Sequence, residues 1–412
     1  MSNSDTRQDA SANPAGVRPF EGVKIVDFTR VLSGPFSTQQ LALLGAEVIK
    51  IEPPGGEEMR FGSLNKAWMD RGLSPGWMSM NSNKETVALD LKHPKAVEVV
   101  KRLVRDADVV VENFRPGVMD RLGVGYAALS EINPRLIYCA ISGFGQSGPE
   151  RGTAAFDGMI QAMSGLMSMT GYEETGPMRA GFAACDIITG MTGAFAISSA
   201  LFQRTHTGKG QFVDVSMLDA TLNCLRQQLV EYTVAGHVQR QFGNLSVSRK
   251  PTADMFRTQS GFLVLAVLTE PQFVRLMKLL GAEHVLGDPR FKDWATRIAN
   301  REALKAIIEA GLASADAATW EVRIKEHDVP GARVWNIDEI ANHPQIAHRD
   351  LLQPIETPFG PVTLVGPGFK LQHGSAKVTR APSRPGADTS AVLRHAGYTD
   401  AEIETLAAEK VI

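Results

Sequence analysis

The chain has little of what marks a secreted, membrane-embedded or nucleic-acid-binding protein. Its 412 residues contain three cysteines (Cys139, Cys185 and Cys224), with none of the CxxC spacing of zinc or redox sites. It has no uninterrupted run of about 18 apolar residues, so we expect no membrane span. The formal net charge of -2 gives no electrostatic reason to bind nucleic acid or an anionic membrane. These shortages favour a globular protein of a reducing compartment, and we expect it in the cytoplasm.

Several catalytic motifs are also missing. The glycine-rich stretch at 142–145 follows an expected strand but does not complete G-x-G-x-x-G, and no GxxxxGK[ST] loop occurs. No G-x-S-x-G elbow is present, and the nine histidines lack the spacing of metal ligands. A serine hydrolase and a metalloenzyme are therefore disfavoured. A dinucleotide-dependent dehydrogenase stays an alternative only because of the expected fold.

What is present is a regular alternation of strand and helix patterns. Apolar runs typical of buried strands occur at 23–28, 47–51, 86–91, 108–112, 136–141 and 210–216. Helical spacing separates them, at 36–44 and 94–105 for example. This alternation predicts an α/β fold with a mostly parallel, Rossmann-like sheet covered on both faces. Ligands of such sheets bind beyond the carboxyl ends of the strands, here 29–33, 52–54, 113–115 and 142–146.

The length and the changes of pattern predict two domains. Residues 1–19 are polar, and we expect a flexible tail there. A large domain is expected from 20–235 together with 330–412, where a β-like stretch returns at 361–368. The stretch 236–329 is expected to form a smaller α+β domain.

One carboxylate stands out because of its place before a long apolar helix. Asp186, in the sequence Cys-Asp-Ile-Ile-Thr-Gly at 185–190, is expected at the helix start, near backbone N–H groups that lack intrahelical partners. Such a carboxylate should be ionised at neutral pH. From these residues alone an N-cap is the more common role, and a nucleophile toward an activated acyl group is the alternative.

Longer motifs resemble the class III CoA-transferases of the CaiB/BaiF type, the family of formyl-CoA transferase and carnitine CoA-transferase. The resemblance covers nearly the whole chain from about residue 20. Its motifs are VKIVDFTRVLSGP at 23–35, LLGAEVIKIE at 43–52, NSNK at 81–84, VENFRPG at 111–117, INPRLI at 132–137, TGKGQ at 207–211 and GYTD at 397–400.

The resemblance implies that Asp186 is the catalytic nucleophile. In the family scheme an aspartyl anhydride forms first and an aspartyl-CoA thioester second, before coenzyme A passes to the acceptor acid. An aspartate near its usual pKa of about 3.9 would need no general base at pH 7. Coenzyme A and acyl-CoA would be substrates, with no cofactor permanently bound. The resemblance also implies an intertwined homodimer.

Twelve positions match family contacts to coenzyme A or its acyl group. They are Leu32, Ser33, Leu89, Asp90, Lys92, Asn113, Phe114, Arg115, Arg121, Ala155, Phe156 and Asp157. Each also has an ordinary interpretation. Lys92 and Arg121 would then be solvated charges, Phe156 a core residue and Asp157 a helix cap.

Two departures from the family pattern bear on the substrate. Pro53 stands where an arginine often follows the Ile-Glu pair, and Arg60 is a candidate substitute for that contact. The glycine-rich loop of formyl-CoA transferase is not evident in the comparable stretch 243–248. This favours the branches that use dicarboxylates, such as the succinyl-CoA-dependent enzymes. Arg249, Lys250 and Arg30 are candidates to pair with a distal carboxylate, and the first two are equally well explained as surface charges.

Two other functions fit the same resemblance. α-Methylacyl-CoA racemases of this fold use a histidine immediately before the position of Asp157, where this chain has Phe156. Phenylalanine cannot move a proton, so racemase chemistry is disfavoured. A non-catalytic acyl-CoA-binding protein is the third alternative, which the presence of Asp186 argues against.

Overall fold

The computed structural model describes residues 16–412, so most of the expected tail lies outside the described residues. The chain forms two compact units. The first unit comprises the chain up to Leu166, Ala180–Val238 and Gln345–Ile412, and the second comprises Met167–Arg179 and Gln239–Pro344. The domain boundaries near 235 and 330 stay predictions.

The first unit is built on a six-stranded parallel sheet, which confirms the predicted mixed α/β fold. Its strand order is β3-β2-β1-β4-β5-β6. The strands are β1 (Lys24–Asp27), β2 (Glu47–Glu52), β3 (Lys84–Ala88), β4 (Val109–Glu112), β5 (Ile137–Ser142) and β6 (Gln211–Ser216). All residues of β4 and β5 are buried, as expected of central strands that helices cover on both faces.

β3 begins two residues before the stretch expected from its apolar pattern. Its first residue, Lys84, is fully buried, and its ammonium lies 3.0 Å from the carboxylate of Asp27 on β1. Lysine usually indicates the surface, so an apolar pattern cannot reveal a strand that starts on a buried ion pair.

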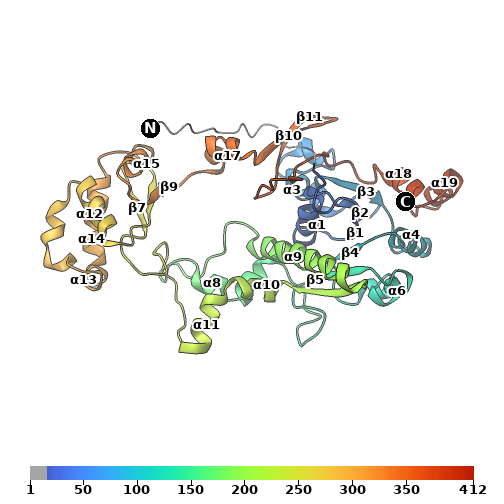
Figure 1. Cartoon of the computed structure of the whole chain (residues 1–412), viewed down its shortest axis with the longest axis horizontal. Coiled ribbons are helices and arrows are strands. Elements are labelled where there is room, and N and C mark those ends of the chain that lie inside the picture. The colour runs from blue at the N-terminus through green and yellow to red at the C-terminus, as the bar shows by residue number, and fades with distance from the viewer. Residues whose placement is uncertain (1–15) are drawn as a thin grey trace, which may run out of the picture. The chain divides into compact units, whose positions relative to one another are not determined.

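Two layers of helices cover the sheet (Figure 1). One face packs against α1 (Ser33–Leu43) and α9 (Ala184–Thr207). The other packs against α4 (Pro94–Val104) and α6 (Tyr126–Ile132), together with the C-terminal helices α18 (Thr389–His395) and α19 (Asp400–Ala408). The C-terminal segment thus completes a core that the N-terminal half of the chain begins.

The helix α9 is long and apolar enough, by length and composition, to cross a membrane, alone among the helices of residues 16–412. In the first unit it packs against α1 and against β5 and β6. The apolar residues on its buried face therefore follow from its position against the sheet.

The remaining elements of the first unit are short. They are η1 (Glu58–Phe61), α2 (Lys66–Met69), α3 (Pro75–Asn81), α5 (Val118–Arg121), α7 (Asp157–Met163), α10 (Met217–Cys224), α11 (Arg226–Ala235) and the antiparallel pair β10 (Leu352–Thr357) and β11 (Gly360–Val365). The single helix expected at 218–234 is divided at Leu225, whose ψ of 18° interrupts the helix.

The second unit combines a three-stranded antiparallel sheet with helices around Phe256, Phe273 and Trp320. Its elements are β7 (Met255–Arg257), β8 (Phe262–Leu265), α12 (Glu270–Leu279), η2 (Glu283–Gly287), η3 (Pro289–Phe291), α13 (Trp294–Ala299), α14 (Arg301–Leu312), α15 (Ala317–Glu326), β9 (Gly331–Arg333) and α16 (Ile337–Ala341). Two further helices, α8 (Leu166–Met169) and α17 (Pro344–Arg349), stand where the chain passes from one unit to the other.

Candidate active site

A pocket of about 220 Å³ opens at the carboxyl ends of the central strands in the first unit. The loops after β1, β4 and β5 line it, together with the first turn of α9. Seven of the residues predicted from the sequence are brought together there: Ser33, Asn113, Phe114, Arg115, Ala155, Phe156 and Asp186. This is the edge at which a parallel sheet is expected to bind its ligand.

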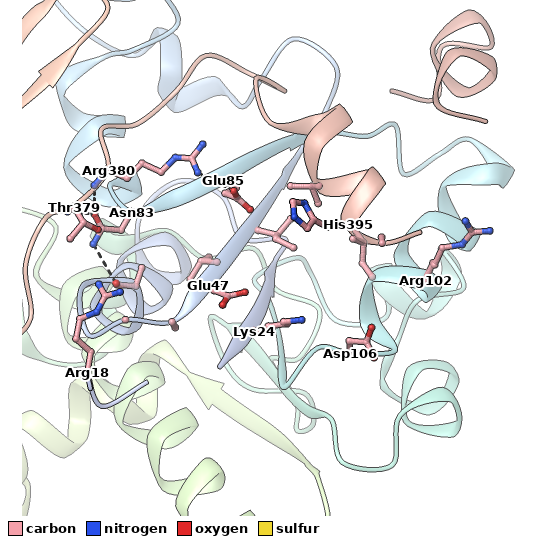
Figure 2. A pocket seen from close by; sticks show the side chains of 18 residues that line it. Arg18, Lys24, Glu47, Asn83, Glu85, Arg102, Asp106, Thr379, Arg380 and His395 are labelled. Atoms are coloured by element: carbon pink, nitrogen blue, oxygen red, sulfur yellow. Dashed lines mark hydrogen bonds and ion pairs between the residues drawn. The ribbon is translucent and has the colours of Figure 1, made fainter. Parts of the chain in front are cut away.

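A larger cavity, of about 400 Å³, lies at the opposite edge of the same sheet (Figure 2). Its lining includes Lys24 and Glu47 at the starts of β1 and β2, and His395 of α18. Charges of both signs face it, and some already pair with each other, as Arg380 does with Glu85 at 3.0 Å. None of the predicted site residues lines this larger cavity. Position and chemistry therefore favour the smaller pocket as the candidate active site.

Asp186 is the third residue of α9 rather than its N-cap. Ala183 occupies the cap position and makes no side-chain hydrogen bond, so the capping interpretation of Asp186 is wrong. Asp157, the first residue of α7, supplies the cap instead. Its Oδ1 accepts hydrogen bonds from the N–H groups of Cys185 at 2.8 Å and Asp186 at 3.4 Å. The carboxylate of Asp186 is thereby left for other partners.

Burial raises the pKa of Asp186 to about 6, and the negative charge of Asp157 adds to the increase. Hydrogen bonds from the hydroxyl and the backbone N–H of Ser33 oppose it. The expectation of an ordinary aspartate pKa is therefore wrong, because the side chain is more enclosed than a helix start suggests. At pH 7 about nine-tenths of this carboxyl group is still ionised.

Glycines on α9 let it approach the start of α1 closely. A Cβ atom built on Gly190 would lie 2.6 Å from the carbonyl oxygen of Ser33, and one on Gly193 would lie 2.8 Å from Oγ of Ser37. Gly190 lies one turn beyond Asp186 on α9. The close approach therefore sets Asp186 beside the N-terminus of α1, where free N–H groups and the helix dipole favour negative charge.

Asn113 ties the ends of β1 and β4 together. Its side chain accepts a hydrogen bond from the N–H of Arg30 and donates one to the carbonyl of the same residue, both at 2.8 Å. The guanidinium of Arg30 stacks over the ring of Phe114 at 5.0 Å. The predicted turn at 113–115 is thus also a fixed wall of the pocket.

Three arginines lie around Gly117: Arg115 and Arg151 are on loops, and Arg121 is the last residue of α5. A Cβ atom built on Gly117 would lie 3.5 Å from Nη1 of Arg121 and 4.0 Å from Nη2 of Arg151. Arg115 and Arg151 line the pocket itself. All three side chains are exposed, and none forms an ion pair within residues 16–412. Sequence reasoning missed Arg151, although its place on the loop after β5 could have indicated it.

The other predicted residues take different positions. Phe156 is 68% exposed and is not a core residue, whereas the side chain of Leu89 is 1% exposed and belongs to the core. Asp90 and Lys92 follow β3 at the same edge of the sheet and do not line the pocket. Leu32 is the N-cap residue of α1, directly before Ser33.

Arg60 cannot take over the contact of the family arginine whose position is occupied by Pro53 in this chain. Its guanidinium is fully buried, makes two hydrogen bonds to the carboxylate of Glu52, and stacks on Trp77 at 3.4 Å. It also donates to the backbone carbonyls of Gly72 and Ser383. The suggestion that it contacts coenzyme A is therefore wrong.

Comparison with known proteins adds an independent finding. The profile of CoA-transferase family III matches residues 20–389. The chain is 33% identical to mouse succinyl-CoA:glutarate CoA-transferase, over 96% of the chain and 91% of that protein. It is 40% identical to the acetyl-CoA:oxalate CoA-transferase of Acetobacter aceti, over 86% of the chain and 91% of that protein. A crystal structure of a CaiB/BaiF family protein from Brucella suis matches with a TM-score of 0.84 and 32% identity, over 92% of this chain and 99% of that one.

Proposed function

Since the chain belongs to CoA-transferase family III, we propose that it transfers coenzyme A from an acyl-CoA to a dicarboxylic acid with Asp186 as the nucleophile. Relatives named for succinyl-CoA and glutarate support succinyl-CoA as the donor. Glutarate and oxalate, the acids named for the relatives, are the first acceptors to consider. The observation that carries the proposal is the carboxylate of Asp186, enclosed in the pocket beside the N-terminus of α1.

The proposed reaction needs no net proton transfer. An Asp186 oxygen attacks the thioester carbon, the C–S bond breaks, and coenzyme A thiolate leaves an aspartyl anhydride behind. The thiolate then attacks the aspartyl carbon, which releases the donor acid and forms an aspartyl-CoA thioester. The acceptor carboxylate attacks that thioester and forms a second anhydride. The thiolate finally takes the acceptor acyl group and returns Asp186 as a carboxylate.

The surroundings of Asp186 suit these steps. With a pKa of about 6 the side chain is mostly ionised at pH 7, and it is more basic than an ordinary aspartate. Each anhydride step passes through a negatively charged oxygen. Donors at the N-terminus of α1, which begins with Ser33, are placed to stabilise such charge.

Arg115, Arg121 and Arg151 are the proposed anchors of the coenzyme A phosphates. Unpaired guanidinium groups at a pocket mouth provide strong, charge-assisted hydrogen bonds to phosphate oxygens. Asp90 and Lys92 lie at the same edge of the sheet, beyond the pocket, and are proposed for the nucleotide end, where the buried Leu89 would contribute only its backbone. Asn113, Phe114, Ala155 and Phe156 would then border the pantetheine and the acyl group.

We also propose that the protein is a cytoplasmic homodimer whose two chains interlock, as in the family it resembles. Large apolar side chains on α9 support a partner. Met191, Phe195 and Phe202 are 49%, 75% and 69% exposed in the single chain. Exposed apolar side chains in such a series usually mark a surface that another chain covers. Light scattering of the purified protein tests this, and a monomeric mass would contradict it.

The test of the function is an exchange assay. The protein is incubated with succinyl-CoA and either glutarate or oxalate in deuterated water, and the acyl-CoAs are separated by chromatography. We expect a new acyl-CoA that depends on the acceptor and is lost in Asp186→Asn. Deuterium at the α-carbon without any acceptor would instead indicate a racemase. Binding without either product would indicate a non-catalytic protein.

A further inference from the structure

The loop between β1 and α1 leads to Ser33, the first residue of α1, and side chains hold the loop backbone at Thr29, Arg30 and Val31. The N–H of Thr29 donates to Asp27 at 2.8 Å, and its carbonyl accepts from the ammonium of Lys50 at 2.7 Å. Both backbone groups of Arg30 bond to Asn113. Hydrogen bonds to the backbone of successive residues favour one conformation of the loop beside the pocket.

The next residue, Val31, is in a conformation that valine rarely adopts. Its φ is +67°, in the left-handed region where the branched side chain meets the backbone. It lines the pocket and is 41% exposed, so packing of its side chain does not explain the conformation. Backbone strain of this kind persists only where the surroundings impose it.

The side chain of Glu57 contacts the backbone of Val31 in this conformation. Its Oε2 accepts a hydrogen bond from the N–H of Val31 at 2.9 Å. Its other oxygen, Oε1, lies 3.0 Å from the ammonium of Lys50 and accepts from the indole N–H of Trp77 at 2.8 Å. Glu57 is 3% exposed, so both of its oxygens are fixed inside the protein and the carboxylate cannot follow the loop if the loop moves.

The conformation of Val31 affects Ser33, which lies two residues later in the chain. Ser33, the first residue of α1, lines the pocket together with Asp186, and hydrogen bonding from its hydroxyl and its N–H lowers the pKa of that carboxyl group. If Val31 relaxed to a negative φ, the chain direction would change and these two donors would turn away. We propose that Glu57 is a positioning residue, which holds Val31 left-handed and thereby aims the donors of Ser33 at Asp186. The proposal rests on the proposed role of Asp186.

Two variants test the role of Glu57, one at each end of its hydrogen bond to Val31. Glu57→Ala removes the acceptor, whereas Val31→Pro removes the N–H and forces φ negative while Glu57 keeps Lys50 and Trp77. Both are expected to slow acylation of Asp186 by roughly 10- to 100-fold, since small misplacements of reacting groups cost rates of that order. Both should also raise the pKa of Asp186 above about 6, because the Ser33 donors that lower it are withdrawn.

A rescue separates positioning from a merely structural role. Glycine adopts positive φ without strain, so Val31→Gly added to Glu57→Ala should recover most of the acylation rate. If Glu57 only stabilised the fold, the added glycine would recover nothing. Trp77→Phe is the matched control. It removes another hydrogen bond of Glu57 but not the one to Val31, so it should lower stability and leave the pKa of Asp186 unchanged.

The pKa can be followed without turnover, which keeps this proposal distinguishable from the proposed function. In each background the free energy of unfolding is compared with that of the same protein carrying Asp186→Asn, from about pH 4 to about pH 8. A wild-type protein that is never acylated would refute the proposed function. An acylated wild type whose Val31→Pro form keeps the same pKa and rate would refute the role of Glu57.

Discussion

Gly190 of α9 and Ser33 of α1 are in close contact where the two helices meet: a Cβ atom on Gly190 would lie 2.6 Å from the Ser33 carbonyl oxygen. Real Cβ atoms do not approach backbone oxygen so closely. The absence of a side chain at 190 is therefore what allows α9 to reach the start of α1. Asp186 and Ser33 meet because of this contact.

The first prediction concerns Gly190→Ala. Alanine at an open helix position normally stabilises by up to about 1 kcal/mol relative to glycine. Here we expect a loss of about 1–3 kcal/mol in the free energy of unfolding, since the helices must separate. The rate of acylation of Asp186 should also fall. Gly76→Ala in α3 is the control, because its Cβ would meet only a methionine methyl at 3.6 Å. Equal effects of the two substitutions would contradict the close-contact account.

The second prediction concerns the pH dependence of the reaction. Only the ionised form of Asp186 attacks, so its acylation rate at low acyl-CoA concentration should rise with pH, reach half its maximum near pH 6 and level off above about pH 7. Rapid-quench measurements of the acyl-enzyme across this range check it. A rate that is flat down to about pH 4 would show that the carboxylate titrates as an ordinary aspartate.

The same pKa affects stability. A raised pKa means that the folded state holds the proton more tightly than the unfolded state, so ionisation of Asp186 destabilises the fold. This penalty is absent below about pH 4 and fully present above about pH 6. Asp186→Asn should therefore be more stable than the wild type at pH 7 by roughly 1–3 kcal/mol, and the difference should vanish in acid. Urea unfolding at the two pH values measures this directly.

Asp157 caps α9, and its negative charge raises the pKa of Asp186. The third prediction separates these two roles. Asp157→Asn keeps an oxygen for the N–H of Cys185 but removes the charge that raises the pKa of Asp186. The pH at which acylation reaches half its maximum should move downward. Asp157→Ala, which loses the helix cap as well, should also cost about 1 kcal/mol of stability. Asp70→Asn, a surface acid paired with Lys66, should change neither quantity.

The fourth prediction concerns Arg151, which the sequence motifs did not indicate. Loss of one charge-assisted contact should weaken coenzyme A binding about tenfold, and less so at high salt. Calorimetric titration of Arg151→Ala with coenzyme A measures the effect. Arg301→Ala removes an exposed arginine that already pairs with Glu302 in the second unit, and should bind as the wild type does. Unchanged affinity of Arg151→Ala would remove it from the site.

Much of the first unit could be predicted because its signals are local. The apolar runs of β4 and β5 stand out, and the helix patterns between strands fix a parallel sheet with its binding edge. Family motifs then pointed to seven residues that the pocket does bring together. Asp186 was identified from its motif, not from its surroundings.

The rest depends on contacts between distant residues. Nothing local to Asp186 shows that Asp157 caps its helix from 29 residues away, or that burial and the charge of Asp157 raise the pKa of Asp186. Arg60 looked available because arginine is usually exposed, whereas Glu52 and Trp77 hold it in the interior. The left-handed Val31 is the extreme case, since valine gives no signal for positive φ and its contact with Glu57 joins residues 26 positions apart.

The most direct test of the central claim is the mass of the peptide that bears Asp186. The protein is incubated with succinyl-CoA, quenched with hydroxylamine and digested. Hydroxylamine converts an aspartyl anhydride or thioester to a hydroxamate, so the account predicts a hydroxamate on Asp186 and none in Asp186→Asn. Transfer of coenzyme A to the acceptor with the Asp186 peptide unmodified would contradict it.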